Sequence, residues 1–134
     1  MKNNKRNINS SNKIGSWGED KAVEYLINKG FCILKRNFYS RLGEIDIIAK
    51  KDNLICFIEV KTRKKGGYKN NKISYILPVE AVDYSKQQRL IRTAEYYLYC
   101  NFSEEFSYRF DVIEVFYYDS YIFSINHLEG AFEV

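Results

Sequence analysis

Apolar residues are concentrated in two neighbouring segments near the middle of the chain. Both segments, residues 43–51 and 54–63, are rich in Ile, Val and Phe, and the polar pair Asp52–Asn53 separates them. This pattern predicts two strands joined by a tight turn. Because a two-residue loop fixes the register of the strands that it joins, the residues that face one another can be counted outward from the turn.

One face of this hairpin is predicted to carry a cluster of charges. The count places Asp46 opposite Glu59 and Glu44 opposite Lys61, and alternation along a strand puts all four side chains on the same face. The other face is formed by Ile45, Ile47, Ile58 and Val60. Carboxylates directly opposite one another repel, since their β-carbons lie about 4.5–5.5 Å apart. We therefore expect a cation between Asp46 and Glu59.

The charged face suits a hard divalent cation and a phosphate. Carboxylate oxygens a few ångströms apart, with positions left for water and a phosphate oxygen, are the ligands that Mg²⁺ requires. Lys61 follows Glu59 by two residues on the same face, so it can orient an attacking water or neutralise charge developing on phosphate. The alternative is a solvated sheet face that carries these charges by chance, because a Glu-x-Lys triplet alone is common.

Asp46 followed by Glu59-Val60-Lys61 resembles the D…ExK core of the PD-(D/E)xK, or restriction-endonuclease-like, nucleases. The resemblance implies a nuclease that depends on Mg²⁺ or Mn²⁺. Asp46 and Glu59 would bind the metal, the Val60 carbonyl would add a ligand, and Lys61 would assist the water or the phosphate.

A Gly-x-x-Gly-Glu sequence that ends at Glu19 extends this resemblance. Together with the later Gly-Glu-Ile-Asp and Glu-Val-Lys, it is similar to the YraN-like family of bacterial proteins, with the spacing kept over residues 14–133. That family is assigned the restriction-endonuclease-like fold and is related to archaeal Holliday-junction resolvases. The resemblance implies DNA as the partner, branched or junction DNA included, with Glu19 completing the acidic cluster and Glu44 as a supporting acid. The alternative for Glu19 is the helix dipole, which favours acids in any first turn.

Hydrophobic periodicity predicts the remaining elements. A first helix is expected over about residues 15–29. A second helix is expected to begin either at Ser85, which would form a capping box with Gln88, or nearer Val79. Further strands are expected over residues 31–38, 110–116 and 121–125. The fold class is therefore α/β, with the order α-β-β-β-α-β-β. We expect a restriction-endonuclease-like mixed sheet flanked by helices, in which the fourth strand runs parallel to the strand of Glu59.

Length and composition favour one globular domain. The 134 residues are 46% hydrophobic, and no apolar run approaches the roughly 20 residues that a membrane span needs. Residues 1–13 are basic and rich in Asn and Ser, so we expect a disordered tail before a single domain over residues 14–134. No secretory signal is apparent, which predicts a cytoplasmic protein without a membrane partner. The cysteines, Cys32, Cys56 and Cys100, are expected to be reduced core residues.

The net charge of +4 favours an anionic partner, and its distribution favours nucleic acid. Basic residues follow the strand of Lys61 and recur at the start of the second helix. They are Arg63, Lys64, Lys65, Lys69, Lys72, Lys86 and Arg89. If the site cleaves a phosphodiester, these residues are placed to hold the neighbouring backbone. The alternative is a solvated loop and helix face.

Three functions remain open at this point. The first is a metal-dependent endonuclease, and the second is a nucleic-acid-binding protein that keeps the fold without cleavage. The third is an interaction protein that uses its tyrosine-rich C-terminal half. The twelve tyrosines are expected mostly in the core and on the sheet, with a homodimer contact as the alternative. Asp111 is expected to accept hydrogen bonds rather than bind metal, and His127 is assigned no function.

Overall fold

The computed structural model describes residues 11–65, 82–118 and 122–133. Its elements are α1 (Ser11–Asn28), β1 (Cys32–Ser40), β2 (Gly43–Lys51), β3 (Leu54–Lys64), α2 (Tyr84–Asn101), β4 (Ser107–Tyr117) and β5 (Phe123–Phe132). The predicted order α-β-β-β-α-β-β is confirmed. Both closing strands are longer than predicted. Residues 119–121, which connect them, lie outside the described residues.

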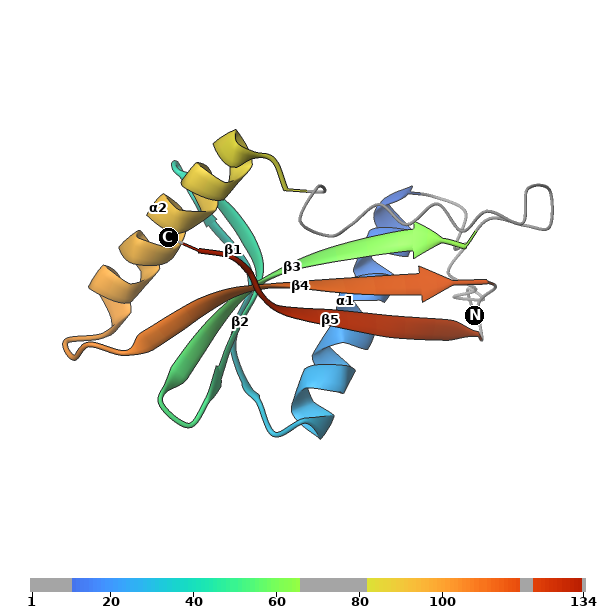
Figure 1. Cartoon of the computed structure of the whole chain (residues 1–134), viewed down its shortest axis with the longest axis horizontal. Coiled ribbons are helices and arrows are strands. Elements are labelled where there is room, and N and C mark those ends of the chain that lie inside the picture. The colour runs from blue at the N-terminus through green and yellow to red at the C-terminus, as the bar shows by residue number, and fades with distance from the viewer. Residues whose placement is uncertain (1–10, 66–81, 119–121, 134) are drawn as a thin grey trace, which may run out of the picture.

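The five strands form one mixed sheet in the order β1-β2-β3-β4-β5. Neighbouring strands are antiparallel except β3 and β4, which run parallel from Leu54–Ser107 to Lys64–Tyr117. A parallel pair needs a long crossover, and here the connection passes through α2, as predicted. The sheet is strongly twisted, so that its strands cross near the centre of the view and fan out on both sides (Figure 1).

The central hairpin has the predicted turn and register. Lys51 pairs with Leu54, and Asp52 adopts a left-handed φ of 53°, a conformation that Asp tolerates in tight turns. The paired ladder ends at Ile47 and Ile58, however, one step before Asp46 would face Glu59. The prediction that these carboxylates form a paired position is therefore wrong. Beyond this point β2 follows β1 and β3 follows β4, so the two strands of the hairpin separate.

Each face of the sheet carries its own hydrophobic core. On the α1 side, Ala22 and Leu26 of the helix pack with Ile47, Ile58 and Val60 of the hairpin. On the α2 side, the cluster contains Ile45, Ile48, Phe57, Leu90 and Ala94. The predicted apolar face thus loses Ile45 to the other side. The face predicted to be charged is apolar at Ile48 and Phe57, because α2 covers it there.

Helix α1 begins four residues before the predicted Gly15, at Ser11. Residues 11–13, predicted as part of a disordered tail, are therefore helical, and residues 1–10 lie outside the described part of the chain. Neither described helix is long and apolar enough to cross a membrane. Cys56 is buried as expected, but Cys32 and Cys100 are exposed, which corrects their assignment to the core, and all three are free thiols.

Helix α2 is capped by Asp83 rather than by the predicted Ser85. The Lys86 N–H donates to Asp83 Oδ1 at 2.8 Å, which satisfies a backbone donor that the helix itself leaves open. Ser85 is the second residue of the helix, and the alternative start near Val79 lies outside the described residues. The cap fixes where the helix begins and so places Lys86 in its first turn.

Candidate active site

The separation of β2 from β3 is bridged by a side chain. Where the ladder stops, the Val60 N–H donates to Asp46 Oδ2 at 2.8 Å. The carboxylate replaces the carbonyl that a continuing strand would have supplied, so the buried donor keeps a partner. Asp46 is therefore held at the point where the two strands separate.

Glu59 is the second carboxylate at this point, and two lysines contact it. Its side chain is 10% exposed. Lys86 Nζ of α2 donates to Glu59 Oε1 at 2.6 Å, and Lys61 Nζ lies 3.4 Å from the same oxygen. Two lysines of the protein thus contact Glu59, and the cation expected between Asp46 and Glu59 stays a prediction. Lys86, predicted as a phosphate contact, belongs to the acidic cluster instead.

The pKa of Asp46 is shifted by its burial and by the charge of Glu59. Burial, and then the charge of Glu59, raise the pKa of Asp46 to about 7, although the Val60 N–H bond opposes this. Burial opposes the charged form of Lys86, but its hydrogen bond to Glu59 and the charges of Glu59 and Asp46 together raise the pKa of Lys86. A buried carboxylate that resists ionisation at neutral pH is typical of sites that take up a proton or a cation.

Glu19 reaches the same cluster from α1. Burial raises the pKa of Glu19 despite the attraction of Arg36, and the charge of Glu59 adds to the rise. The charge of Glu19 in turn raises the pKa of Asp46. Glu19 lies in the interior of α1, whose first turn contains no acid, so the helix dipole does not explain its position.

Two neighbours of Glu19 explain the second half of the Gly-x-x-Gly-Glu sequence. Gly18 lies against Thr62 of β3, and a β-carbon built on Gly18 would approach Thr62 Cβ to 2.9 Å. Before it, Trp17 packs edge-on against Tyr117 and Phe123, with ring centroids 5.9 and 5.5 Å apart. The glycine lets α1 approach β3 beside Lys61, and the indole anchors that end of the helix. Together they carry Glu19 to the carboxylates.

We predict that Gly18→Ala destabilises the fold by about 1–3 kcal/mol, the usual range for overpacking a close contact. The added methyl group must displace Thr62, whose short branched side chain has little freedom to move. Denaturant unfolding measures this change. Thr62→Ala in the same chain should recover part of the loss, and Gly15→Ala is the control, because nothing lies within 4 Å of a β-carbon there. Equal stability of both alanine variants would contradict the close approach.

The predicted basic residues after Lys61 are only partly available to a ligand. Arg63 Nε lies 3.2 Å from Glu114 Oε2, and Lys65 Nζ donates to the Tyr118 hydroxyl at 2.6 Å. Lys64 is exposed. Lys69 and Lys72 lie outside the described residues. Among the described basic residues that follow Lys61, Lys64 is therefore the main candidate for contact with nucleic acid.

Glu114 is a buried acid that the sequence analysis missed. It lies on β4 in register with Lys61, and it contacts Arg63 and the Asn126 amide, 3.1 Å away. A glutamate within an apolar strand was the available signal. Glu44, by contrast, is exposed and lines a hollow with Lys86 and Arg89, so it lies beside the carboxylate cluster and has no contact with Asp46 or Glu59 among the described residues.

His127 and Asp111 form a polar network on the α1 side of the sheet. Asp111 is buried and accepts both donors of the Arg109 fork, at 2.7 and 2.9 Å, and the Gly130 N–H at 3.0 Å. His127 Nε2 lies 2.8 Å from Asp111, and its other ring nitrogen lies 3.1 Å from the Tyr25 hydroxyl. These bonds outweigh burial and lower the pKa of Asp111. The predicted hydrogen-bonding role of Asp111 is confirmed, and His127 gains a structural one.

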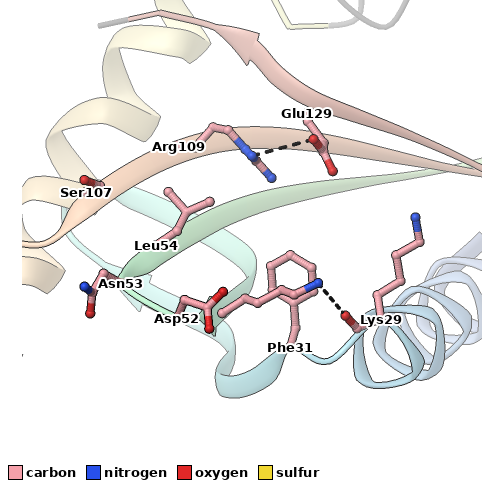
Figure 2. Close-up of a pocket in the computed structure, with 9 residues that line it drawn as sticks. Lys29, Phe31, Asp52, Asn53, Leu54, Ser107, Arg109 and Glu129 are labelled. Atoms are coloured by element: carbon pink, nitrogen blue, oxygen red, sulfur yellow. Dashed lines mark hydrogen bonds and ion pairs between the residues drawn. The ribbon is translucent and has the colours of Figure 1, made fainter.

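A hollow of about 450 Å³ lies near the turn of the hairpin, away from the carboxylates (Figure 2). Its cations are Lys29, Lys51 and Arg109, and its acids are Asp52 and Glu129. Lys51 Nζ donates to the Lys29 carbonyl at 2.8 Å, and Arg109 pairs with Glu129 at 3.7 Å. One of its cations is therefore paired with an acid, a second donates to a backbone carbonyl, and Asp52 adds a further negative charge, so this hollow is a weaker candidate for an anionic ligand.

The carboxylate cluster fits a magnesium-type ion that a substrate helps to bind. Among the described residues no three acidic, histidine or cysteine side chains are placed to enclose a metal. Mg²⁺ is usually held by one or two carboxylates, waters and substrate phosphates, so a complete protein cage is not required. Asp46 Oδ1 and Glu59 Oε2 have no partner within the described part of the chain, and both belong to the hard oxygen donors that such an ion prefers.

The chain is an α/β protein with a five-stranded mixed sheet between two helices, and the residues of the D…ExK pattern lie where two of its strands separate. The chain belongs to the uncharacterised protein family UPF0102, whose model matches residues 18–115. This range contains Glu19, Asp46, Glu59, Lys61 and Lys86. The YraN-like resemblance is thereby confirmed.

Relatives of similar length share almost half of their residues with this chain. A UPF0102 protein of Clostridium perfringens is 45% identical over 122 residues, which cover 90% of this chain and 94% of the relative. One of Alkaliphilus oremlandii is 46% identical over 122 residues, covering 90% and 97%. One of Caldicellulosiruptor bescii is 46% identical over 105 residues, covering 78% and 82%.

Proposed function

We propose that the protein is a metal-dependent nuclease that hydrolyses phosphodiester bonds of DNA. The observation that carries this proposal is the position of Asp46 and Glu59 where β2 and β3 separate, beside Lys61, with Glu19 near enough for its charge to raise the pKa of Asp46. A purely structural role does not account for three acids there, because their repulsion and burial disfavour the charged state. Hydrolysis aided by a bound cation gives this arrangement a use.

Each residue has a distinct part in this proposal. Asp46 and Glu59 would hold Mg²⁺ or Mn²⁺, with the Val60 carbonyl as a further ligand and Glu19 acting directly or through water. The ion would polarise the phosphate and lower the pKa of the attacking water. Lys61 is placed next to Glu59 to donate to a phosphate oxygen or to orient the water. Lys86 keeps Glu59 Oε1 in place through its 2.6 Å bond.

The candidate substrate contacts address the DNA backbone. Lys64 and Arg89 are exposed, and Lys69 and Lys72 belong to the same proposal. Point charges on a strand end and a helix contact phosphates without reading base edges. We therefore propose recognition by backbone or shape rather than by base sequence.

Affinity for DNA is expected to fall steeply with salt. If three to five phosphates are neutralised, the dissociation constant should rise about 40-fold to 500-fold between about 50 and 200 mM salt. Fluorescence anisotropy with a chelator present measures binding without cleavage. A dissociation constant that stays level across this range would exclude a phosphate-based mode.

The experiment that tests the function is metal-dependent cleavage of plasmid, single-stranded and branched DNA, and of RNA. Asp46→Asn, purified in the same way, controls for contaminating nucleases. A nucleic-acid-binding protein without cleavage is the second candidate, and it is favoured by the lysine that already neutralises Glu59. Binding without cleavage, and without a rise in melting temperature on adding metal, would decide for that candidate.

A further inference from the structure

A hollow of about 530 Å³ adjoins the candidate active site, between the β1–β2 turn and the start of α2. It is lined by Tyr39, Ser40, Arg41, Leu42, Gly43, Glu44, Lys86, Arg89 and Leu90. Lys86 belongs to both places, because its Nζ bonds Glu59, and Glu44 precedes Asp46 by two residues on β2. Its volume lies within the range of about 300–1,000 Å³ that is usual for small-molecule sites. A group bound there would therefore lie next to the carboxylates.

The lining of this hollow is unbalanced in charge. Three cations, Arg41, Lys86 and Arg89, line it together with a single acid, Glu44, and of the three only Lys86 already has an acidic partner, Glu59. Within the part of the chain that the structure describes, Arg41 and Arg89 form no ion pair, so both guanidinium groups are available to an outside anion. The hollow near the hairpin turn differs, because two acids lie among its three cations and one of them, Glu129, pairs with Arg109. The charge here favours phosphate groups.

An aromatic ring stands exposed at the same rim. The Tyr39 side chain is 79% exposed and that of Leu42 is 42% exposed. No described segment covers them. Exposed rings beside cations form the platforms on which single-stranded nucleic acids stack their bases, whatever the base. A paired base within a duplex has no free face for such stacking.

The turn that carries Tyr39 is held in place against α2. Ser40 Oγ accepts a hydrogen bond from the Leu42 N–H at 3.1 Å and donates to the Gly43 carbonyl at 3.3 Å. Gly43 has a φ of 154°, and a β-carbon there would lie 3.0 Å from Thr93 Oγ1, so glycine allows the close approach to the helix. A turn fixed in this way presents the ring without a large ordering cost on binding.

We propose that this hollow is the subsite for an unpaired nucleotide next to the scissile phosphate. Its base stacks on Tyr39, and its phosphates are bound by Arg41 and Arg89. The inference rests on the proposed nuclease function and names its substrate class. That class is DNA with a single-stranded segment, free or flanking a duplex, rather than continuous duplex.

The test compares Tyr39→Ala with Tyr39→Trp on two probes, a short oligodeoxythymidine and a short mixed-sequence duplex. Affinity is measured by anisotropy with a chelator, and cleavage is measured with Mg²⁺ or Mn²⁺. Tyr39→Ala should weaken binding of the single strand about 5-fold to 160-fold, the range for losing one stacked base, and change duplex binding less than about two-fold. Tyr39→Trp should bind like the wild type. Tyr99→Ala is the matched control, since Tyr99 is 87% exposed and lies outside this hollow.

Each outcome bears on a different statement. An equal loss on both probes, or no loss, would overturn the subsite while leaving any observed cleavage intact. Selective loss on the single strand, with no cleavage of either probe, would keep Tyr39 as a contact for single-stranded DNA but overturn its place beside a scissile phosphate. Sedimentation of the wild type and of Tyr39→Ala tests whether this surface joins two copies of the chain. If Tyr39→Ala converts a dimer to a monomer, the surface joins two copies of the chain, and the subsite is overturned.

Discussion

Asp46→Asn is expected to abolish metal-dependent cleavage while leaving the metal-free protein at least as stable as the wild type at neutral pH. An asparagine oxygen can still accept the Val60 N–H bond, which is 2.8 Å long in the wild type. What is lost is a buried negative charge beside Glu59 and the hard oxygen ligand of the proposed metal. Loss of one such group should lower cleavage by at least about 10²-fold to 10³-fold.

The pH dependence of stability gives this prediction its sign. The pKa of Asp46 is raised from 3.8 to about 7 on folding, so its contribution is fully present below about pH 4 and is lost as pH rises through 7. Asp46→Asn removes that loss. Relative to the wild type, the variant should therefore gain between about 0.5 kcal/mol, the scale of an opposed like-charged pair, and about 4 kcal/mol, the full linkage value, across this interval.

Denaturant unfolding at several pH values, with a chelator present, measures the metal-free stability. Thermal unfolding with a chelator and then with Mg²⁺ or Mn²⁺ measures the response to metal. Metal should raise the melting temperature of the wild type and leave that of the variant nearly unchanged, because a ligand stabilises only the fold that binds it. Glu24→Gln is the control, an acid of α1 whose side chain is 63% exposed. A marked loss of metal-free stability in Asp46→Asn, with the metal response intact, would make Asp46 a structural acceptor and place the site elsewhere.

Lys61→Ala is expected to reduce cleavage about 10²-fold to 10³-fold without loss of the fold or of metal binding. A lysine does not ligate Mg²⁺, whereas its charge can act on phosphate or water. The fold should persist because Glu59 keeps its shorter bond to Lys86, 2.6 Å against 3.4 Å to Lys61. The variant thus separates the chemical step from assembly of the site.

Single-turnover cleavage and melting temperatures with and without metal check this second prediction. Lys64→Ala is the matched control, an exposed lysine three residues further along the same strand. It should affect substrate binding at low salt more than the rate at saturation. Cleavage by Lys61→Ala at the wild-type rate would remove Lys61 from the mechanism.

The features predicted correctly are those with local signals. The hairpin turn and its register follow from the Asp52–Asn53 pair, and the element order follows from periodicity. The end of the ladder at Ile47 and Ile58 has no such signal, because it depends on β2 following β1 while β3 follows β4. The faces of the hairpin were misassigned for the same reason, since covering by α2 decides which side chains are buried.

The candidate site divides in the same way. Asp46, Glu59 and Lys61 could be placed from hairpin geometry, but the bond from Lys86 to Glu59 joins residues on either side of a long crossover. No spacing rule relates them. The cap of α2 was missed because Ser85 with Gln88 matches a capping box, whereas Asp83 acts alone. Contact with Thr62 explains Gly18, which the sequence showed only as part of a motif.

The parallel pairing of β3 with β4 also sets the order in which the chain can fold. Leu54 pairs with Ser107, which lies far along the chain. Closing so long a loop is slow compared with forming the β1–β2–β3 meander. Until α2 and β4 arrive, Phe57 lacks its neighbours on the α2 side, so a newly made chain presents an apolar strand to other copies. Lys86 reaches Glu59 only in that late step. We therefore expect the assembled acidic cluster to be among the last parts of the molecule to form and among the first to be lost on unfolding.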